Sequence, residues 1–168
     1  MTTIKFKNGN MFDQCIGKYD LFLFYGNNGM AFGLGYLFLR DRYNEFKNIG
    51  NPFATHANQP IPYSNNKKLV CIPADYMTND ELSDNLTLWL EYAREQKFRK
   101  ISLTGVRDSL KIGMTDITEA KINDNNRVKF IVEFIKKWLQ SNKSNIMEVL
   151  LISASDNYTR NYNESIII

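Results

Sequence analysis

Short apolar segments alternate with longer amphipathic ones along this chain. Residues 20–25, 69–72 and 101–104 are dominated by apolar side chains, as in strands that are covered on both faces of a sheet. Residues 4–7 alternate apolar with polar positions and predict a half-exposed strand. A further strand is expected over residues 147–152. The pattern therefore predicts five strands separated by longer connections.

Three segments between these strands have apolar residues at helical spacing and predict amphipathic helices. The first helix begins just after Gly33. The second opens with the capping-box pair Thr78 and Glu81, and the third is expected to be capped by Asn125 or Asn126. The apolar positions of the three helices are Leu34, Leu37 and Phe38; Leu82, Leu86, Trp89, Leu90 and Ala93; and Val128, Ile131, Ile135, Trp138 and Leu139.

Strands that alternate with helices of this length favour right-handed crossover connections. The chain has 168 residues, of which 43% are apolar and 23% charged, values typical of one globular domain. We therefore expect a single α/β domain over residues 1–168, with a mixed, largely parallel central sheet between helical layers. Residues 50–68 contain three of the four prolines together with many Asn and Ser residues, which predicts a long surface loop.

The formal net charge of +3 arises from 21 basic and 18 acidic residues that are interspersed. A small-molecule anion is therefore a more suitable partner than nucleic acid. No apolar run is long enough to span a membrane, and the first ten residues do not resemble a signal peptide, so we expect a cytoplasmic protein. His56 is the single histidine, and Cys15 and Cys71 lack the spacing of a metal site. We expect no metal, no resident cofactor and two reduced, partly buried thiols.

Glycine-rich segments follow two of the predicted buried strands. Gly26, Gly29, Gly33 and Gly35 lie between a strand and a helix, and residues 105–113 begin and end with glycine. Glycine lets the backbone approach a ligand closely, and amides at the start of a helix bind phosphate. The spacing matches neither the nucleotide-kinase loop nor the GxGxxG dinucleotide fingerprint. Each segment alone fits a tight turn without ligand equally well, but two such segments side by side would hold a pyrophosphate.

These segments resemble those of the macro domain family, in the same order along nearly the whole chain. Residues 9–12, Gly-Asn-Met-Phe, are similar to the Gly-Asp-Ile turn after the family's first strand. Residues 28–35, Asn-Gly-Met-Ala-Phe-Gly-Leu-Gly, resemble its first phosphate loop, and residues 105–113 its second. Residues 150–158 resemble its closing strand and the aromatic-bearing turn beside the distal ribose. The resemblance implies a three-layer α/β/α macro-like fold that binds ADP-ribose or a related nucleotide.

The resemblance also implies a set of ligand-binding residues. It assigns residues 29–33 and 105–113 to the phosphates, Asn10 and Met11 to the base, and Tyr158 to a ribose. Arg107 would offer phosphate a forked donor, with a solvated loop side chain as the alternative. The full set is Asn10, Met11, Asn27, Asn28, Gly29, Met30, Ala31, Phe32, Gly33, Gly105, Val106, Arg107, Gly113, Asn157 and Tyr158.

Three positions depart from the family pattern. Asn10 stands where the family usually has an aspartate that accepts a hydrogen bond from the adenine amino group, and an amide oxygen accepts that bond with less charge assistance. Ala31 replaces a glycine of the first phosphate loop. Asp75 lies where members that remove ADP-ribose from DNA bases have a lysine, so that reaction is not expected.

Three classes of function remain open from the sequence. The first is a nucleotide-binding macro-like domain that, if it is an enzyme, hydrolyses an ADP-ribosyl or terminal phosphate bond. Asp13 or Asn27 would then orient the water, and no catalytic residue is assigned. The second is a non-catalytic protein that sequesters or senses a nucleotide, for example a phage counter-defence factor. The third is a nucleic-acid or protein-interaction module, for which we find no basic stripe with interleaved aromatic residues.

Overall fold

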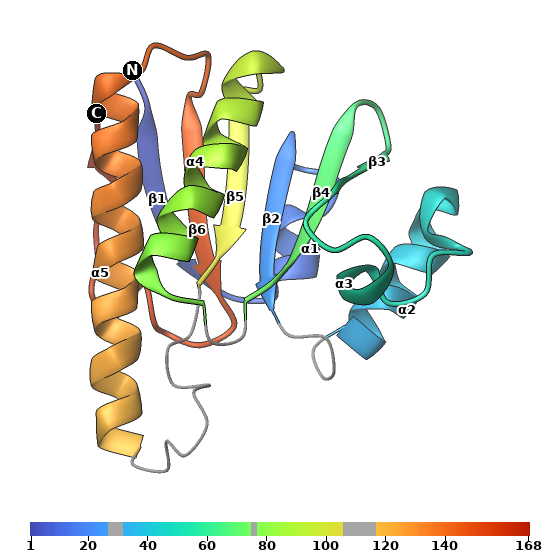
Figure 1. Cartoon of the computed structure of the whole chain (residues 1–168), viewed down its shortest axis with the longest axis horizontal. Helices are drawn as coiled ribbons and strands as arrows, with labels where there is room; N and C mark the ends of the chain where they lie inside the picture. Colours follow the sequence, from blue (N-terminus) through green and yellow to red (C-terminus); the bar gives the residue numbers. More distant parts are fainter. Residues whose placement is uncertain (27–31, 75–76, 106–116) are drawn as a thin grey trace.

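The computed structural model describes residues 1–26, 32–74, 77–105 and 117–168. These residues form one seven-stranded sheet with the strand order β3-β4-β2-β5-β6-β1-β7. The five central strands run parallel (Figure 1). β3 and β7 are antiparallel to their neighbours and occupy the two edges. The strands are β1 (Thr3–Asn8), β2 (Leu21–Gly26), β3 (Pro60–Tyr63), β4 (Lys67–Pro73), β5 (Lys100–Thr104), β6 (Glu148–Ser153) and β7 (Ile166–Ile167).

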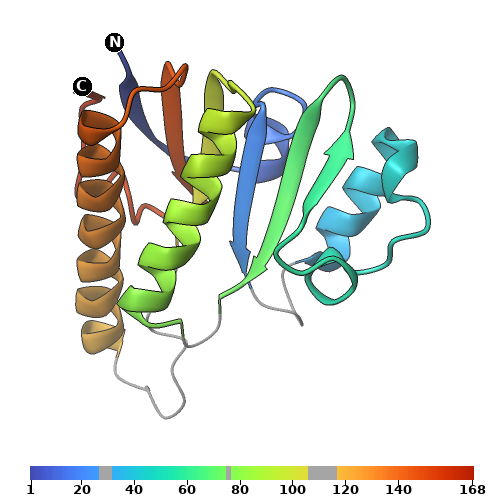
Figure 2. The same ribbon diagram turned by 45° about the horizontal axis from the view of Figure 1, so that its top comes forward.

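Helices cover both faces of this sheet, as Figures 1 and 2 show. α4 and α5 lie together on one face, whereas α1 and α2 pack on the other. The helices are α1 (Met11–Cys15), α2 (Phe32–Arg42), the short 3-10 helix η1 (Asn44–Phe46), α3 (Pro52–Thr55), α4 (Asn79–Glu95) and α5 (Ile117–Ser141). The predicted architecture, a mixed and largely parallel sheet between helical layers, is confirmed.

The strand β2 is covered on both faces, as its apolar run predicts. No side chain of residues 21–25 is more than 5% exposed. Leu21 and Leu23 belong to the core beneath α4 and α5, whereas Phe22 and Phe24 belong to the core beneath α1 and α2. Because neighbouring side chains of a strand point to opposite faces, β2 contributes to both cores and lies near the middle of the sheet.

Two predicted helix starts have different outcomes. α4 begins directly after Thr78, and its capping box is formed: the Thr78 hydroxyl accepts from the Glu81 backbone N–H at 3.1 Å, and the Glu81 carboxylate accepts from the Thr78 N–H. The predicted cap at Asn125 or Asn126 is wrong, because α5 begins at Ile117 and both asparagines lie inside it. Trp89 is in the core, as its place on the apolar stripe of α4 predicts.

The prediction of a long surface loop over residues 50–68 is also wrong. This segment contains α3 and β3, and β3 pairs with β4. Pro60 and Pro62 are exposed in β3, while Ile61 and Tyr63 are buried. Proline lacks the N–H that a central strand needs but is tolerated on an edge strand. The prolines therefore mark the edge of the sheet rather than a loop.

Both cysteines are free and fully buried. Burial raises the pKa of the Cys15 thiol to about 11 and raises the pKa of Cys71 further. Both thiols therefore stay protonated at neutral pH and react slowly. Within the described ranges, no helix combines the length and the apolar character that crossing a membrane requires.

Candidate functional site at the carboxyl edge of the sheet

The strands β2 and β5 end side by side at one edge of the sheet. They are parallel neighbours, with Leu23 paired to Leu103, so both end at their common carboxyl edge, at the bottom of Figure 1. The first glycine segment starts at Gly26, the last residue of β2, and the second starts at Gly105, directly after β5. Open α/β sheets bind ligands at the carboxyl ends of their strands. This edge is therefore the candidate functional site.

Most of the predicted phosphate contacts lie outside the described residues. These are Gly29, Met30 and Ala31 of the first segment and Val106, Arg107 and Gly113 of the second; Asn27, Asn28 and Asp75 also lie outside the described residues. The eleven-residue helix α2 begins at Phe32, before the expected start after Gly33, so Gly33 and Gly35 lie inside the helix rather than between the strand and the helix.

Gly26 is required by packing at the end of β2. A Cβ atom at this position would lie 2.8 Å from Phe24 Cε1 and 2.9 Å from Phe53 Cζ, well inside normal carbon–carbon contact. The Gly26 carbonyl accepts a hydrogen bond from the Ala74 N–H at 2.8 Å, which extends the link between β2 and the chain after β4. Gly26 therefore has a structural reason to be glycine that is independent of any ligand.

The side chain of Thr104 joins the ends of β2 and β5. Backbone pairing between these strands covers residues 21–23 of β2, whereas β2 pairs with β4 as far as Gly26. Beyond the last pair, Thr104 Oγ1 accepts a hydrogen bond from the Tyr25 N–H at 2.9 Å and donates one to the Tyr25 carbonyl at 3.2 Å. Thr104 is only 4% exposed, so both bonds are sheltered from water.

Tyr158 lies beneath the start of the second glycine segment. Its side chain is fully buried, and its hydroxyl donates to the Thr104 carbonyl oxygen at 3.3 Å. A Cβ atom at Gly105 would lie 3.6 Å from the Tyr158 ring. We expected this ring to stack beside a ribose, but a ring without exposed surface has no face to offer a ligand. In this conformation Tyr158 supports Gly105 instead.

Asn10 and Met11 lie at the turn from β1 into α1. β1 pairs with β6, and the Gly9 N–H donates to the Ser153 carbonyl at 3.0 Å, so this turn is at the same edge as the glycine segments. Asn10 is exposed, and its Oδ1 caps α1 by accepting from the Phe12 N–H at 3.0 Å. Met11 is partly buried against the core. A base bound here would share the Asn10 oxygen with the helix cap.

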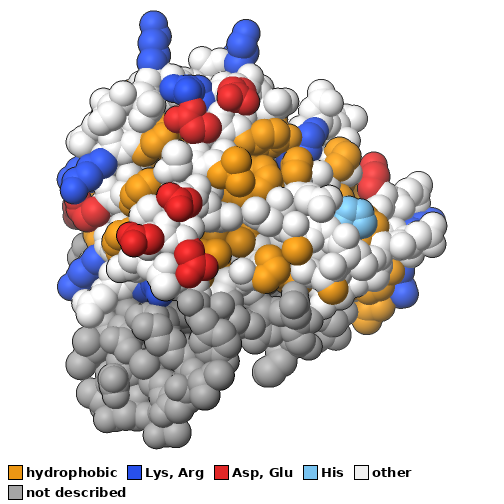
Figure 3. All heavy atoms as spheres, in the orientation of Figure 1, with side chains coloured by type: hydrophobic (Ala, Val, Ile, Leu, Met, Phe, Trp, Pro, Cys, Tyr) orange, Lys and Arg blue, Asp and Glu red, His pale blue; other side chains and the backbone are white. Residues whose placement is uncertain are grey.

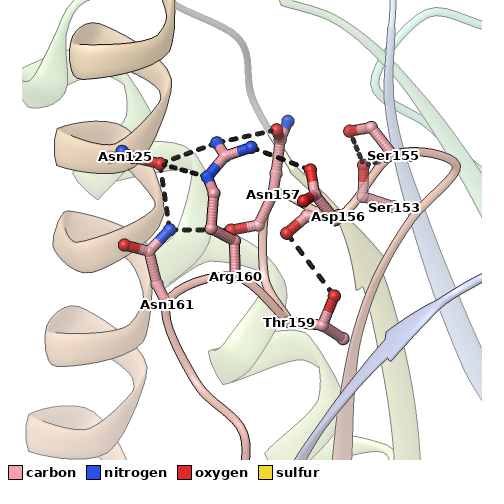
Figure 4. Close-up of polar contacts among 8 residues, drawn as sticks. All are labelled: Asn125, Ser153, Ser155, Asp156, Asn157, Thr159, Arg160 and Asn161. Carbon is pink, nitrogen blue, oxygen red and sulfur yellow. Dashed lines mark hydrogen bonds and ion pairs between the residues drawn. The ribbon is translucent and has the colours of Figure 1, made fainter.

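A polar network follows β6 at this edge (Figure 4). The Arg160 guanidinium donates to Asn125 Oδ1 at 2.7 and 3.2 Å and to Asp156 Oδ1 at 2.8 Å. Its contact with Asn157 Oδ1 is longer, at 3.4 Å, and Asn161 donates to Asn125 at 3.0 Å. The network ties the turn after β6 to α5. Of these residues, sequence reasoning assigned only Asn157 to the site and expected Asn125 to cap a helix, although the four-residue spacing of Asp156 and Arg160 was an available signal.

Among the described residues, the remaining candidate groups do not gather into a metal centre. Across the ranges that the structure describes, no group of three or more His, Cys, Asp or Glu side chains is arranged to hold a metal ion. His56 lies at the end of α3 with Nδ1 2.9 Å from the Thr55 hydroxyl, and Asp13 is exposed on α1. The described part of the edge thus offers hydroxyl, amide and backbone groups, the carboxylates of Asp13 and Asp156, and the guanidinium of Arg160.

A separate hollow lies on the outer side of the helical layer formed by α4 and α5. This α4–α5 groove has a volume of about 420 Å³ and is lined by Asn79, Asn126, Lys129, Phe130, Glu133, Phe134 and Lys137. Both acidic and basic side chains appear on this face of the molecule in Figure 3. Its mixed charge is less suited to a diphosphate than are converging backbone amides.

The fold has matches among solved structures, although no protein-family model and no curated protein matches the sequence. The macrodomain of Thermus aquaticus DarG matches with a TM-score of 0.50 and 14% identity, over 89% of this chain and 97% of that chain. A mutant of tomato leucine aminopeptidase matches with a TM-score of 0.54 and 11% identity, over 92% of this chain and 33% of that one. The chain therefore has the fold of a macro domain, as its sequence segments predict.

Proposed function

We propose that this chain binds ADP-ribose or a related nucleotide at the carboxyl edge of its sheet. The observation that carries the proposal is the parallel pairing of β2 with β5. Because the two strands are neighbours, both glycine segments start from adjacent points, and their amides can converge on one diphosphate. The resemblance of both segments to macro-domain phosphate loops supports the same class of ligand.

The start of α2 supports an anionic ligand at this place. Its first amides have no partner within the helix and carry the positive end of the helix dipole. An anion near such a helix start gains about 0.3–1 kcal/mol at an exposed site and more when partly buried. The glycines allow the backbone to approach phosphate oxygens closely, and Arg107 would add a forked donor.

The order of the strands indicates how the rest of the nucleotide would extend from the diphosphate along the edge of the sheet. From β2 the sheet continues through β5 and β6 to β1, so a ligand that extends along the edge from the diphosphate reaches the turn at Asn10. We propose that Asn10 and Met11 contact the base and that Asn157 lies beside the sugar. Tyr158 acts from beneath, as the support of Gly105.

Nucleotide binding requires fewer functional groups at this site than hydrolysis of the nucleotide does. Hydrolysis needs a group that orients water, and the two candidates are Asn27, which lies outside the described residues, and Asp13, which is exposed on α1. We therefore propose nucleotide binding as the basic activity. A sequestering or sensing protein, such as a phage counter-defence factor, would use the same site and release its ligand unchanged, whereas a hydrolase would cleave an ADP-ribosyl or terminal phosphate bond.

Calorimetric titration of the purified protein tests the proposal. ADP-ribose, ADP-ribose 1″-phosphate, NAD and ADP are titrated separately, and each mixture is then incubated and analysed for products. We expect saturable one-to-one binding of ADP-ribose. Recovery of intact ligand indicates sequestration, and loss of the 1″-phosphate or of another group indicates hydrolysis. Absence of heat with all four nucleotides, in a protein shown to be folded, would contradict the proposal.

The variant Gly33→Glu tests the assigned segment. A glutamate at the start of α2 would place a bulky anion where we propose a phosphate, so binding should be lost. Thr87→Glu makes the same change of charge at an exposed position in the middle of α4 and should bind normally. Circular dichroism of both variants checks the fold. Parental affinity in a folded Gly33→Glu variant would show that the segment is wrongly assigned.

A further inference from the structure

We infer that Thr104 is a positioning residue whose hydroxyl sets the spacing between the ends of β2 and β5, the two points from which the glycine segments start. The inference rests on the proposed function and identifies the side chain on which the geometry of that site depends. Thr104 itself does not touch the ligand. Its effect is transmitted through the backbone of both strands.

The backbone directions at the end of β2 require a partner at this point. Successive residues of a strand direct their N–H and C=O groups to opposite neighbours. The Gly26 carbonyl bonds toward the β4 side, to the Ala74 N–H, so both polar groups of Tyr25 face β5. Backbone pairing with β5 has already ended at Leu23 and Leu103. The single hydroxyl of Thr104 satisfies both groups of Tyr25 instead.

A side chain in this place separates the strands. Direct N–H···O=C bonds hold neighbouring strands at about 4.8 Å, and an inserted hydroxyl group requires a wider spacing. We therefore expect β2 and β5 to diverge at their carboxyl ends, while the backbone pairing of residues 21–23 with residues 101–103 holds them together further back. The opening is at the point from which both glycine segments start, where a diphosphate needs room between two sets of amides.

Two buried tyrosines anchor this arrangement from outside. The Tyr158 hydroxyl donates to the Thr104 carbonyl at 3.3 Å, and its ring lies under Gly105. The Tyr25 hydroxyl donates to Asn85 Oδ1 of α4 at 2.8 Å. Burial raises the pKa of both phenols, so both remain protonated donors. Thr104 is thus held by Tyr158 from the turn after β6, and Tyr25 is held by Asn85 of α4.

The chemistry of the side chain gives a graded test. The position needs a group that both accepts from an N–H and donates to a carbonyl, which threonine and serine do fully, cysteine does weakly and valine cannot do. Thr104→Val keeps the shape and removes the hydroxyl, Thr104→Ser keeps the hydroxyl, and Thr104→Cys is intermediate. Each variant is titrated calorimetrically with ADP-ribose and with AMP, whose single phosphate needs only one glycine segment.

We expect Thr104→Val to bind ADP-ribose at least about tenfold more weakly than the parent, because two buried backbone groups lose their partner and shift. Thr104→Ser should stay within about threefold, with Thr104→Cys between the two. The loss should be smaller for AMP than for ADP-ribose, at unchanged one-to-one stoichiometry. A merely unfolded fraction would instead reduce the stoichiometry for both ligands alike.

Three results would overturn the inference. They are parental affinity in Thr104→Val, equal losses for ADP-ribose and AMP, and a Thr104→Ser variant as weak as Thr104→Val. If Thr104→Val does not fold, the comparison of Thr104→Ser with Thr104→Cys decides, and equal affinities overturn the inference. Failure of the parent protein to bind ADP-ribose is a distinct outcome, because it removes the proposed function itself and the inference with it.

Discussion

The phenyl ring of Phe12 occupies the space in which a side chain at Gly35 would stand. A Cβ atom at Gly35 would lie 2.9 Å from both Cε1 and Cε2 of Phe12 and closer still to Cζ. The contact joins α1, whose cap is Asn10, to α2, whose first residues include Gly33. It therefore fixes the turn assigned to the base relative to the helix start assigned to phosphate.

Gly35→Ala is expected to destabilise the protein although alanine favours helices. The gain in helix propensity is about 1 kcal/mol, whereas forcing a methyl group into a filled core site costs about 1–3 kcal/mol. We expect a net loss of up to about 2 kcal/mol in the free energy of unfolding, measured by urea denaturation. Adding Phe12→Leu to the Gly35→Ala variant should restore part of the lost stability, because the smaller side chain leaves space for the new methyl group.

Gly9→Ala is the matched control. A Cβ atom at Gly9 would meet only Gln14 Cγ, at 3.9 Å, which is an ordinary contact, so its stability should change by less than about 0.5 kcal/mol. If Gly35→Ala were more stable than the parent, or if its loss were unaffected by Phe12→Leu, the proposed contact between α1 and α2 would not limit packing.

Glu148 links three elements at the opposite, amino edge of the sheet. Its carboxylate accepts from Lys5 Nζ of β1 at 2.7 Å and from the Tyr19 hydroxyl at 2.5 Å, and Lys100 of β5 lies 4.0 Å away. Burial alone would raise the pKa of this carboxyl, but the bonds from Lys5 and Tyr19 and the positive charges outweigh it and lower the pKa below 4.5. The folded protein thus binds this proton less tightly than the unfolded chain.

The sign of that shift predicts an acid-dependent contribution to stability. Because the folded pKa is depressed, the contribution is present above about pH 4.5 and is lost as the pH falls through the folded value. Glu148→Gln should lower the free energy of unfolding by about 1–2 kcal/mol at pH 7 and by less at pH 3. Glu95→Gln, at an exposed position of α4, should have little effect. An equal loss at both pH values in Glu148→Gln would contradict this account.

Asn58 and Asn66 both adopt left-handed backbone angles, with φ of 55° and 65°, but within the described part of the chain only Asn58 has side-chain bonds across the fold. Asn58 Oδ1 accepts from Asn85 at 2.9 Å and from Trp89 Nε1 at 3.0 Å. Replacing either asparagine with glycine removes the strain of the left-handed backbone conformation and gains up to about 1 kcal/mol. At Asn58 the replacement also removes the acceptor of the Trp89 N–H, and leaving that donor unpaired costs about 1–3 kcal/mol. Thermal unfolding should show Asn66→Gly at or above parental stability and Asn58→Gly below it. Equal shifts in the two variants would count against the role of the Asn58 side chain.

The sequence predicts the central sheet well because its signals are local. The buried strands are short apolar runs, and the start of α4 is a pair of capping residues three positions apart. The edge strand β3 was missed because a segment with two prolines resembles a loop in composition. Only its pairing with β4 distinguishes this strand from a loop. Asn125 was assigned as a cap because asparagine favours that position, whereas here its amide oxygen binds Arg160 from a distant part of the chain.

The place that we propose for the site follows from the sequence, whereas the contacts that support this edge of the sheet do not. Glycine after a buried strand is visible in the sequence, so the carboxyl edge could be identified in advance. The burial of Tyr158 under Gly105 depends on how the turn after β6 folds back over the sheet, and the Thr104 hydroxyl acts only because pairing between β2 and β5 ends early. Such contacts join residues that are far apart in the sequence, and no local pattern encodes them.

The central claim is that both glycine segments contact one diphosphate. The most direct test is a titration of the isotope-labelled, assigned protein with ADP-ribose, followed by the backbone amide resonances in solution NMR. We predict that the amides of Gly29, Gly33, Gly105 and Gly113 shift together along one binding curve, while those of Phe130 and Phe134 in the α4–α5 groove do not move. A response confined to one glycine segment, or strongest in the groove, would contradict the account.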